Sequence, residues 1–323
     1  MSRYLSLEPD PFPSHGGSAD RRARGLYIAA RTDRGLERQN NEDHAAFADL
    51  AGGHAFEPPA SVVVRLPPGE VRAPIVALVC DGMGGEAGGE VASRLAIDTI
   101  VPVLRESVSR RLRPRGDPVA ASTRAEETEP EALAHERLLA RGLVASIEAA
   151  SARIKEEARR QPRLARMGTT ATVAAFLDGA GGRRGTLVCA QVGDSRAYLL
   201  RGGSLTQVTH DQTMVEYLRR SGVPIENAHE MVGGHVILQA VGSSTRLDVA
   251  ITQTPLEDGD TVLVCSDGLS GVVADDVIRE TLLAYEDPAD VCDGLVRRAL
   301  EAGGPDNVTC IVARLTATAE TMT

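Results

Sequence analysis

The chain has 323 residues, of which 42% are hydrophobic and 25% charged, and its net charge is −10. With 3% aromatic residues and no Trp, it predicts a globular protein whose core is filled by aliphatic side chains. The acidic balance argues against non-specific binding of nucleic acid, and no apolar stretch is long enough to span a membrane. We therefore expect neither nucleic acid nor membrane as a partner.

The cysteines lie singly inside apolar runs, and no Cys-x-x-Cys pair occurs. We interpret them as small buried hydrophobic residues in a reducing compartment. No apolar segment follows the first charged residues of the chain, so the expected location is the cytoplasm. The five cysteines are Cys80, Cys189, Cys265, Cys292 and Cys310.

The first part of the chain predicts a tail followed by strands. Residues 1–24, with Pro, Gly-Gly and mixed charge, are expected to be a disordered N-terminal tail. Residues 52–73, rich in Gly and Pro, predict an enlarged loop around a short strand. The apolar run that ends at Asp81 predicts a strand buried on both faces, followed by a glycine-rich turn. The expected strands are residues 25–30, 44–48, 61–65 and 76–80.

Two long helices are predicted next. Residues 88–104 carry apolar side chains at helical spacing, and Pro102 is expected to kink or shorten that helix. Residues 105–130 have an Arg-rich half and an acidic half, so they predict a mobile insertion. A long helix is expected at 131–160.

From Gly168 onward, short strands separated by Gly-containing turns are typical of antiparallel sheet. The order of strands, helix pair, strands, helix pair and strand predicts an α+β protein with helices packed outside antiparallel sheet. We expect one domain over residues 25–316 and a polar tail at 317–323. The predicted strands are 169–177, 185–192, 195–200, 235–241, 248–254, 261–265 and 308–312, and the predicted helices are 210–220, 274–285 and 288–302.

Acidic residues recur in or beside turns at the ends of the apolar strands. A single Asp-Gly pair usually supports only its own turn, but six acidic residues in matching contexts favour a shared site. Carboxylates gathered in one place repel each other unless a cation compensates their charge. The set is Glu42, Asp43, Asp81, Asp194, Asp267 and Asp306.

The chemistry of this set favours particular metals. Oxygen ligands without His or Cys select Mg²⁺ or Mn²⁺ over Zn²⁺. Two such ions can lower the pKa of a water and direct it at phosphorus. Arg38, five residues before Asp43, is placed to bind phosphate oxygens; taken alone, it would be interpreted as a solvated turn charge.

Six short motifs occur in a fixed order along the chain: Arg38-x-x-x-Glu42-Asp43, Asp81-Gly82-Met83-Gly84-Gly85, Gly168-Thr169-Thr170, Gly193-Asp194-Ser195-Arg196, Ser266-Asp267-Gly268 and Gly304-Pro305-Asp306-Asn307. In order and rough spacing they resemble the metal-dependent serine/threonine protein phosphatases of type 2C, in their bacterial form. The resemblance runs from about Gly25 to Leu315.

The resemblance implies a four-layer α-β-β-α sandwich, with two antiparallel sheets face to face and helices outside. It also implies a binuclear Mn²⁺ or Mg²⁺ centre at one edge. Asp81 would bridge both ions, the Gly82 carbonyl would bind one, and Asp267 and Asp306 would bind the other.

The remaining roles also follow from the resemblance. Asp43 and Glu42 would serve the same centre directly or through water, and Asp194, with Asp267, would hold a third, weaker ion. Arg38 would be the phosphate clamp. Asn307 would orient water or the Asp306 carboxylate.

Two features depart from the pattern of many relatives. Eukaryotic members often carry a His after the Asp-Gly pair, whereas this chain, like bacterial members, has Met83; His44 and His210 are candidates for the general acid by residue type alone. Residues 212–234 correspond to the variable flap beside the metal centre. Where relatives often have an Arg before the next strand, this chain has Gly233-Gly234-His235.

The function implied is hydrolysis of phosphoserine and phosphothreonine in proteins by direct attack of a metal-activated water. Its partners would be phosphorylated proteins, the substrates of a Ser/Thr kinase, and the enzyme is expected to be a monomer. One alternative is a catalytically silent regulatory protein of the same fold, although none of the six carboxylates is missing. The other is a two-metal nuclease, which the negative net charge of the chain disfavours.

Overall fold

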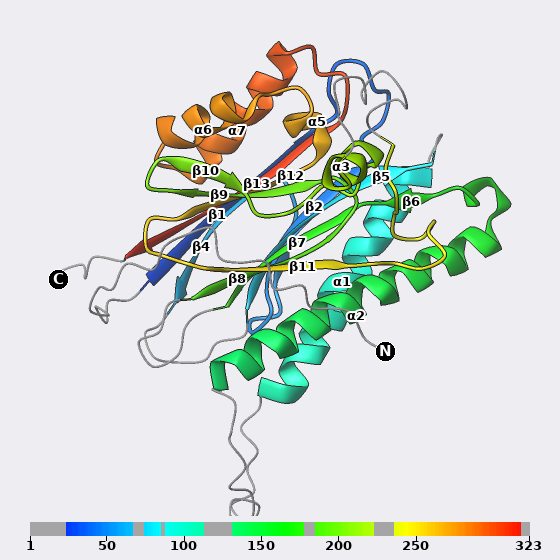
Figure 1. Cartoon of the computed structure of the whole chain (residues 1–323), viewed down its shortest axis with the longest axis horizontal. Helices are drawn as coiled ribbons and strands as arrows, with labels where there is room; N and C mark the ends of the chain where they lie inside the picture. The colour runs from blue at the N-terminus through cyan, green and yellow to red at the C-terminus, as the bar shows by residue number, and fades with distance from the viewer. Residues whose placement is uncertain are drawn as a thin grey trace, which may run out of the picture.

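The computed structural model describes residues 24–66, 74–84, 88–112, 131–177, 185–222 and 236–317. In these ranges, two antiparallel sheets stack face to face and helices cover the outer face of each, as Figure 1 shows. The predicted α+β class and the four-layer sandwich are therefore confirmed. The predicted tail up to residue 23 and the residues after 317 lie outside the described ranges.

Within the described ranges, the first sheet has six strands in the order β10-β9-β12-β13-β1-β4. Its central pair is β1 with β13, which are antiparallel over ten residues. The strands are β1 (Arg24–Asp33), β4 (Ala60–Leu66), β9 (Arg196–Arg201), β10 (Ser204–Gln207), β12 (Thr261–Cys265) and β13 (Val308–Ala317).

The second sheet follows the order β11-β8-β7-β5-β2-β3, and β6 pairs with the end of β5. The central strand β5 is buried from Ile75 to Cys80, as expected for an apolar run between two layers. The strands are β2 (Asp43–Asp49), β3 (Ala55–Phe56), β5 (Ile75–Met83), β6 (Gly168–Thr169), β7 (Ala171–Leu177), β8 (Thr186–Val192) and β11 (Ala250–Pro255).

Three hydrophobic layers hold the sandwich together. The layer between the sheets contains Leu26, Phe47 and Val264, and Phe47 stacks on Phe56 with ring centroids 5.1 Å apart. The other two layers lie between each sheet and its helices. Because aliphatic side chains fill all three layers, the scarcity of aromatic residues does not prevent a large core.

The helices divide between the two outer faces. The long helices α1 (Gly88–Leu112) and α2 (Glu131–Arg160) cover the second sheet, and α6 (Asp275–Ala284) and α7 (Pro288–Glu301) cover the first (Figure 1). None of the helices in the described ranges is long and apolar enough to cross a bilayer. The short elements are η1 (Pro162–Leu164), α3 (Met214–Arg220) and α5 (Asp267–Ser270).

The predicted end of the first long helix is wrong. The helix α1 runs through Pro102 to Leu112, so residues 105–112 do not belong to an insertion. A proline removes one backbone hydrogen bond, whereas Leu104 and Val108, on the following turns, are buried in the layer that α1 and α2 share. Packing therefore outweighs the local cost. The rest of the predicted insertion, 113–130, lies outside the described residues.

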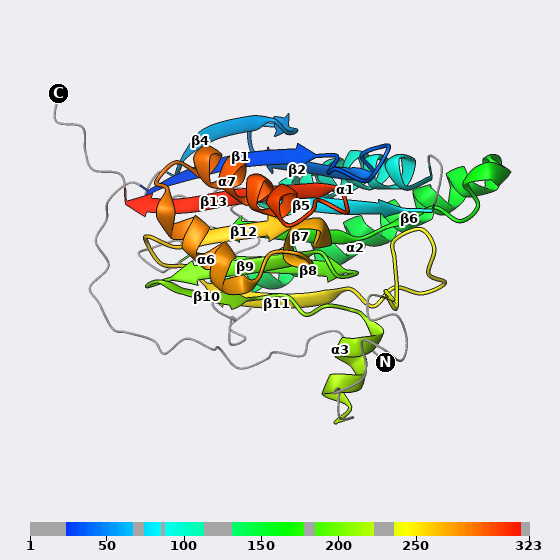
Figure 2. The same ribbon diagram turned by 90° about the horizontal axis from the view of Figure 1, so that it is seen from above.

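The region around the flap also differs from the prediction. The helix α3 begins at Met214, where Thr213 caps it by accepting a hydrogen bond from Glu216 N, and not at His210. In place of the predicted strand at 235–241, the described residues 236–241 make only isolated bridges, Thr213 with Ile237 and Thr169 with Val241. Figure 2 shows α3 projecting from the sandwich on the side of β11.

Candidate metal centre

The segments that carry the predicted carboxylates meet at one edge of the sandwich. In the second sheet, Asp43 of β2 lies directly opposite Asp81 of β5. In the first sheet, Asp267 follows β12 and Asp306 precedes its partner β13. Ser266 Oγ donates a hydrogen bond of 2.7 Å to Asp43 Oδ2. This bond joins the two sheets where the acidic residues gather.

The carboxylates repel one another strongly. Burial raises the pKa of Asp81 well above its ordinary value, and the charges of Asp43, Asp267 and Asp194 and a hydrogen bond with Asp267 raise it further. Burial also raises the pKa of Asp43 to about 7, against hydrogen bonds that lower it. The pKa of Asp194 rises to about 7, first through burial and then through the charge of Asp267. A cation would relieve this repulsion.

The donor chemistry of the cluster fits a hard divalent cation. All the side chains offer carboxylate oxygen, which Mg²⁺ and Mn²⁺ prefer. Asp194 is 5% exposed, and its Oδ1 is buried without a hydrogen-bond partner among the described residues. Such an atom is costly unless a ligand satisfies it. The residues therefore suit a bound cation.

The cluster is not a closed ligand set as it stands. No three His, Cys, Asp or Glu side chains of the described residues are arranged so that they could hold a metal ion. Asp306 is already engaged, because Oδ2 accepts a 2.6 Å bond from Arg38 Nη2 and Oδ1 accepts one from Asn307 N. A cation that binds Asp306 must therefore compete with Arg38.

Arg38 and Glu42 lie on the loop between β1 and β2. The Arg38 side chain is 52% exposed while it pairs with Asp306. Burial raises the pKa of Glu42, the charge of Arg38 lowers it, and the charge of Asp306 raises it. The charges of Arg38 and Asp306 therefore both act on Glu42. About half of the Arg38 side chain remains open to solvent.

Asn307 holds this loop in place. Its Nδ2 donates to the carbonyl groups of Arg34 and Asn40 at 2.8 and 2.9 Å, and its Oδ1 accepts from Glu42 N at 2.7 Å. The residue is 5% exposed. Its side-chain amide is thus used by the backbone of the loop that carries Arg38 and Glu42. The structure gives Asn307 a positioning contact with that loop.

Two threonines that received no role from the sequence hold the backbone of Asp81. Thr170 Oγ1 accepts from Asp81 N at 2.9 Å, and Thr170 N donates to Asp81 O at 2.8 Å. Thr169 Oγ1 donates to the same carbonyl at 2.9 Å. The only signal in the sequence was the motif Gly168-Thr169-Thr170, which does not say what it contacts.

Gly82 permits a close approach of three backbone segments. A Cβ atom at this position would lie 2.2 Å from Gly89 O and 2.6 Å from Glu42 O. The Gly82 N–H donates to the same Glu42 carbonyl at 3.2 Å. Only glycine lets the end of β5, the start of α1 and the Glu42 loop meet here.

The two histidines considered as acids have other contacts. His44 Nδ1 lies 2.9 Å from Ser93 Oγ on α1, and burial lowers the pKa of His44. His210 N donates to Gln191 Oε1 at 3.0 Å, and its side chain lines a cleft beside α3. Met83 pairs with Gly168 at the end of β5.

Comparisons with known proteins agree with this architecture. Residues 69–310 match the family model described as "Protein phosphatase 2C". The chain is 37% identical over 289 residues to "Serine/threonine protein phosphatase PstP" of Mycobacterium tuberculosis. The aligned residues are 89% of this chain but 45% of that relative. It thus spans about half the length of that relative. It is 30% identical to "Serine/threonine phosphatase stp" of Listeria welshimeri, over 89% of this chain and 95% of the relative.

Solved structures show the same fold. The crystal structure of the M. tuberculosis phosphatase PstP/Ppp superposes with a TM-score of 0.63 at 33% identity, over 90% of this chain and 99% of that chain. A structure of the PstP catalytic domain "in complex with 2 Manganese ions" has a TM-score of 0.62 at 33% identity, over 91% of this chain and 99% of that one.

Proposed function

Because the chain belongs to the protein phosphatase 2C family, we propose that it is a metal-dependent protein phosphatase. It hydrolyses phosphoserine and phosphothreonine in proteins, with Mn²⁺ or Mg²⁺ as cofactor. The observation that carries this proposal is the gathering of Asp43, Asp81, Asp194 and Asp267 at one edge, where each of the first three carboxyl groups has a raised pKa. The two Mn²⁺ ions reported for the PstP catalytic domain support the same cofactor here.

The proposed ligands are those that the resemblance to the family implies. Asp81, at the centre of the repulsion, would hold the ions. Gly82 would contribute its carbonyl, and Asp267 and Asp306 would also bind a cation. Glu42 and Asp43 support the same centre directly or through water. Asp194, whose Oδ1 lacks a partner among the described residues, serves a third, weaker site together with Asp267.

Bound divalent cations would lower the pKa of a water molecule and neutralise charge on the phosphate. The protein itself supplies the guanidinium of Arg38, which can bind phosphate oxygens in a bidentate manner. Asn307 fixes the loop that carries Arg38, through three backbone contacts. Thr170 fixes Asp81 in the same way. These contacts limit the motion of the reacting groups before the substrate arrives.

The partners and location belong to the same proposal. The substrates are proteins phosphorylated by a Ser/Thr kinase, and the protein acts in signalling as a cytoplasmic monomer. The cysteines support a reducing compartment, because all five are free and buried.

Purified protein should hydrolyse p-nitrophenyl phosphate and a phosphothreonine peptide with Mn²⁺, and EDTA should stop both reactions. Asp81→Asn should lower turnover at least about 100-fold, because the residue at the centre of the carboxylates loses its charge. Steady-state kinetics and circular dichroism test both statements. The matched control is Asp98→Asn, on the exposed side of α1.

The control should keep wild-type turnover, and Asp81→Asn should keep the wild-type circular dichroism spectrum. Full activity in EDTA would refute the proposal. No turnover of either phosphate ester, with Mn²⁺ binding intact, would favour a silent regulatory protein. Cleavage of an oligonucleotide in preference to the phosphopeptide would favour a two-metal nuclease.

A further inference from the structure

A cleft of about 1010 Å³ lies beside the candidate centre and has no role in the mechanism described above. It is lined by the flap stem at residues 210–213, by α3 and by the loop 243–248. The floor is formed by residues 249–252, which include the start of β11. We call this the strand-edge cleft.

Among the described residues, the floor of the strand-edge cleft is a sheet edge without a further strand on its outer side. The strand β11 is the last strand of the second sheet, and the only described strand that pairs with it is β8. The outer edge of such a strand carries main-chain N–H and C=O groups that can pair with another extended chain. A polypeptide in the cleft could therefore extend the sheet.

The cleft reaches the candidate centre on two sides. On one side, Gln212 N donates to Gly193 O, and Gln212 Oε1 accepts from Gly193 N at 2.8 Å, so the cleft wall is fixed to the residue before Asp194. On the other side, Ser243 packs against Gly168, which pairs with Met83 next to Gly82. A chain lying in the cleft would thus lead to the edge where the phosphate is expected.

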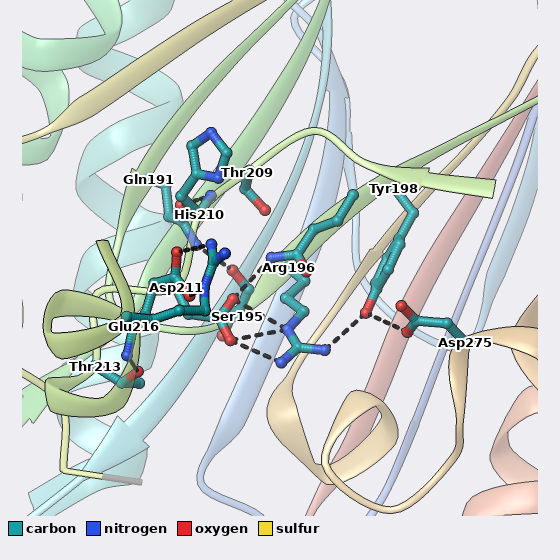
Figure 3. A network of polar contacts seen from close by, with 12 residues as sticks. Gln191, Ser195, Arg196, Tyr198, Thr209, His210, Asp211, Thr213, Glu216 and Asp275 are labelled. Carbon is teal, nitrogen blue, oxygen red and sulfur yellow. Dashed lines mark hydrogen bonds and ion pairs between the residues drawn. The ribbon is translucent and has the colours of Figure 1, made fainter. Parts of the chain in front are cut away.

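Three acidic residues in the described part of the chain line the cleft, Asp211, Glu216 and Asp248, and the first two are paired with arginines of the protein itself. Asp211 accepts from both Arg196 Nε and Nη2, the closest at 2.7 Å, and Figure 3 shows this pair, with Arg196 also donating to Tyr198. Glu216 pairs with Arg219. These pairs leave the two acidic groups less able to repel a negatively charged ligand.

The walls also present groups that suit a peptide. Arg220 and Arg246 line the cleft, and the positive charge of Arg220 also acts on Glu216. Tyr217 and Leu238 are 59% and 44% exposed and offer apolar surface. Because Arg196 and Arg219 already pair with Asp211 and Glu216, Arg220 and Arg246 are opposed by one further lining carboxylate, Asp248. This balance favours acidic side chains of a ligand.

We propose that the strand-edge cleft binds the polypeptide that flanks the phosphorylated residue of the substrate, as an extended strand against β11 and with a preference for acidic side chains. This inference rests on the proposed phosphatase activity and adds a docking site to it. Main-chain pairing gives affinity, while Arg220, Arg246 and Tyr217 select the sequence. A small phosphate ester is too short to use the site.

The first test compares substrates of different length. The kcat/KM of a phosphothreonine peptide with acidic flanks is measured relative to that of p-nitrophenyl phosphate, for the wild type and for the Arg220→Ala/Arg246→Ala double variant. We expect this ratio to fall about tenfold in the double variant, and to fall less for a peptide with alanine flanks. The matched control is Arg297→Ala/Arg298→Ala on the exposed face of α7, which should leave the ratio at the wild-type value.

The second test detects the peptide on the strand without using turnover. A phosphonate analogue of the acidic peptide is added to the Mn²⁺-loaded protein, and amide hydrogen exchange is followed by mass spectrometry. Segments that contain residues 249–252 should exchange more slowly, and backbone N-methylation of the peptide should reduce this protection.

An unchanged ratio in the double variant, together with unchanged exchange in β11, would overturn the docking site. If the wild type turns over neither substrate, the proposed activity fails instead. In that case hydrogen exchange decides on the cleft alone: slower exchange in β11 supports the docking site, and unchanged exchange refutes it.

Discussion

At the scale of single residues, burial of the carboxyl groups near the edge makes their ionised form destabilise the folded protein. Asp43 and Asp194 are 4% and 5% exposed, and burial is the first cause that raises the pKa of each to about 7. An acid whose pKa is higher in the folded state than in the unfolded state binds its proton more tightly when folded. Such a group stabilises the fold at low pH and loses this contribution as the pH rises.

We therefore predict a pH effect on stability in EDTA. The contribution of Asp194 is fully present below pH 3.8, its ordinary pKa, and is lost as the pH rises through about 7. Asp194→Asn should remove this loss, so the variant should exceed the wild type at pH 8 by an amount on the order of 1–4 kcal/mol. Urea denaturation of both proteins between pH 4 and pH 8 measures the difference, with Asp98→Asn as the control.

The difference between Asp194→Asn and the wild type should grow with pH. A difference that stays constant from pH 4 to pH 8 would show that the carboxyl group of Asp194 titrates normally. Saturating Mn²⁺ should reduce the difference, because a cation relieves the same repulsion.

At the scale of elements, close contacts between short segments fix the geometry of the centre. The short helix α5 starts at Asp267 and packs on the turn that carries Asp306 and Asn307. A Cβ atom at Gly268 would lie 1.9 Å from Asn307 O and 3.5 Å from Asp306 Cβ. The glycine at position 268 therefore lets α5 lie against this turn, so that two of the proposed ligands, Asp267 and Asp306, stand on elements in contact.

Gly268→Ala should push α5 away from this turn. We expect a loss of about 1–3 kcal/mol in the free energy of unfolding, together with weaker Mn²⁺ binding. Chemical denaturation and isothermal titration calorimetry measure the two effects. The matched control is Gly52→Ala, where a Cβ atom would meet only side-chain atoms, the nearest being Asp49 Oδ2 at 3.3 Å.

Gly52→Ala should change the free energy of unfolding by no more than about 0.5 kcal/mol. If Gly268→Ala keeps both the stability and the Mn²⁺ affinity of the wild type, the contact between α5 and the 306–307 turn does not position the ligands.

At the scale of the whole molecule, the candidate centre joins the two sheets. Asp43 and Asp81 come from the second sheet, whereas Asp267 and Asp306 flank strands of the first. The bond from Ser266 to Asp43 is a direct link between these halves. A cation shared by ligands from both sheets would stabilise their packing, because it binds only the assembled site.

Mn²⁺ should therefore raise the melting temperature of the wild type. At 100 times the dissociation constant the gain is about 2.7 kcal/mol, which corresponds to roughly 5–10 °C for a domain of this size. Differential scanning fluorimetry over a Mn²⁺ titration measures the shift. Asp81→Asn should abolish most of it, whereas Asp98→Asn should retain it; equal shifts in both variants would locate the stabilising ion elsewhere.

Much of the architecture was predictable from local patterns. Apolar runs identified the buried strand β5, and helical spacing identified α2, α6 and α7. Both signals are local, because the period of side-chain burial is set within each element. A predicted boundary was wrong where a contact with a distant segment sets the end of the element. The helix α1 continues through Pro102 because its later turns pack in the layer shared with α2.

The sequence by itself predicted which carboxylates form the candidate centre, since Asp81, Asp267 and Asp306 stand in motifs at strand ends. Only the tertiary structure decided that Asp43 faces Asp81, that Thr170 holds Asp81, and that Asn307 fixes the loop of Arg38. These contacts join residues far apart along the chain. Their distances depend on sheet order and register, which neither composition nor periodicity encodes.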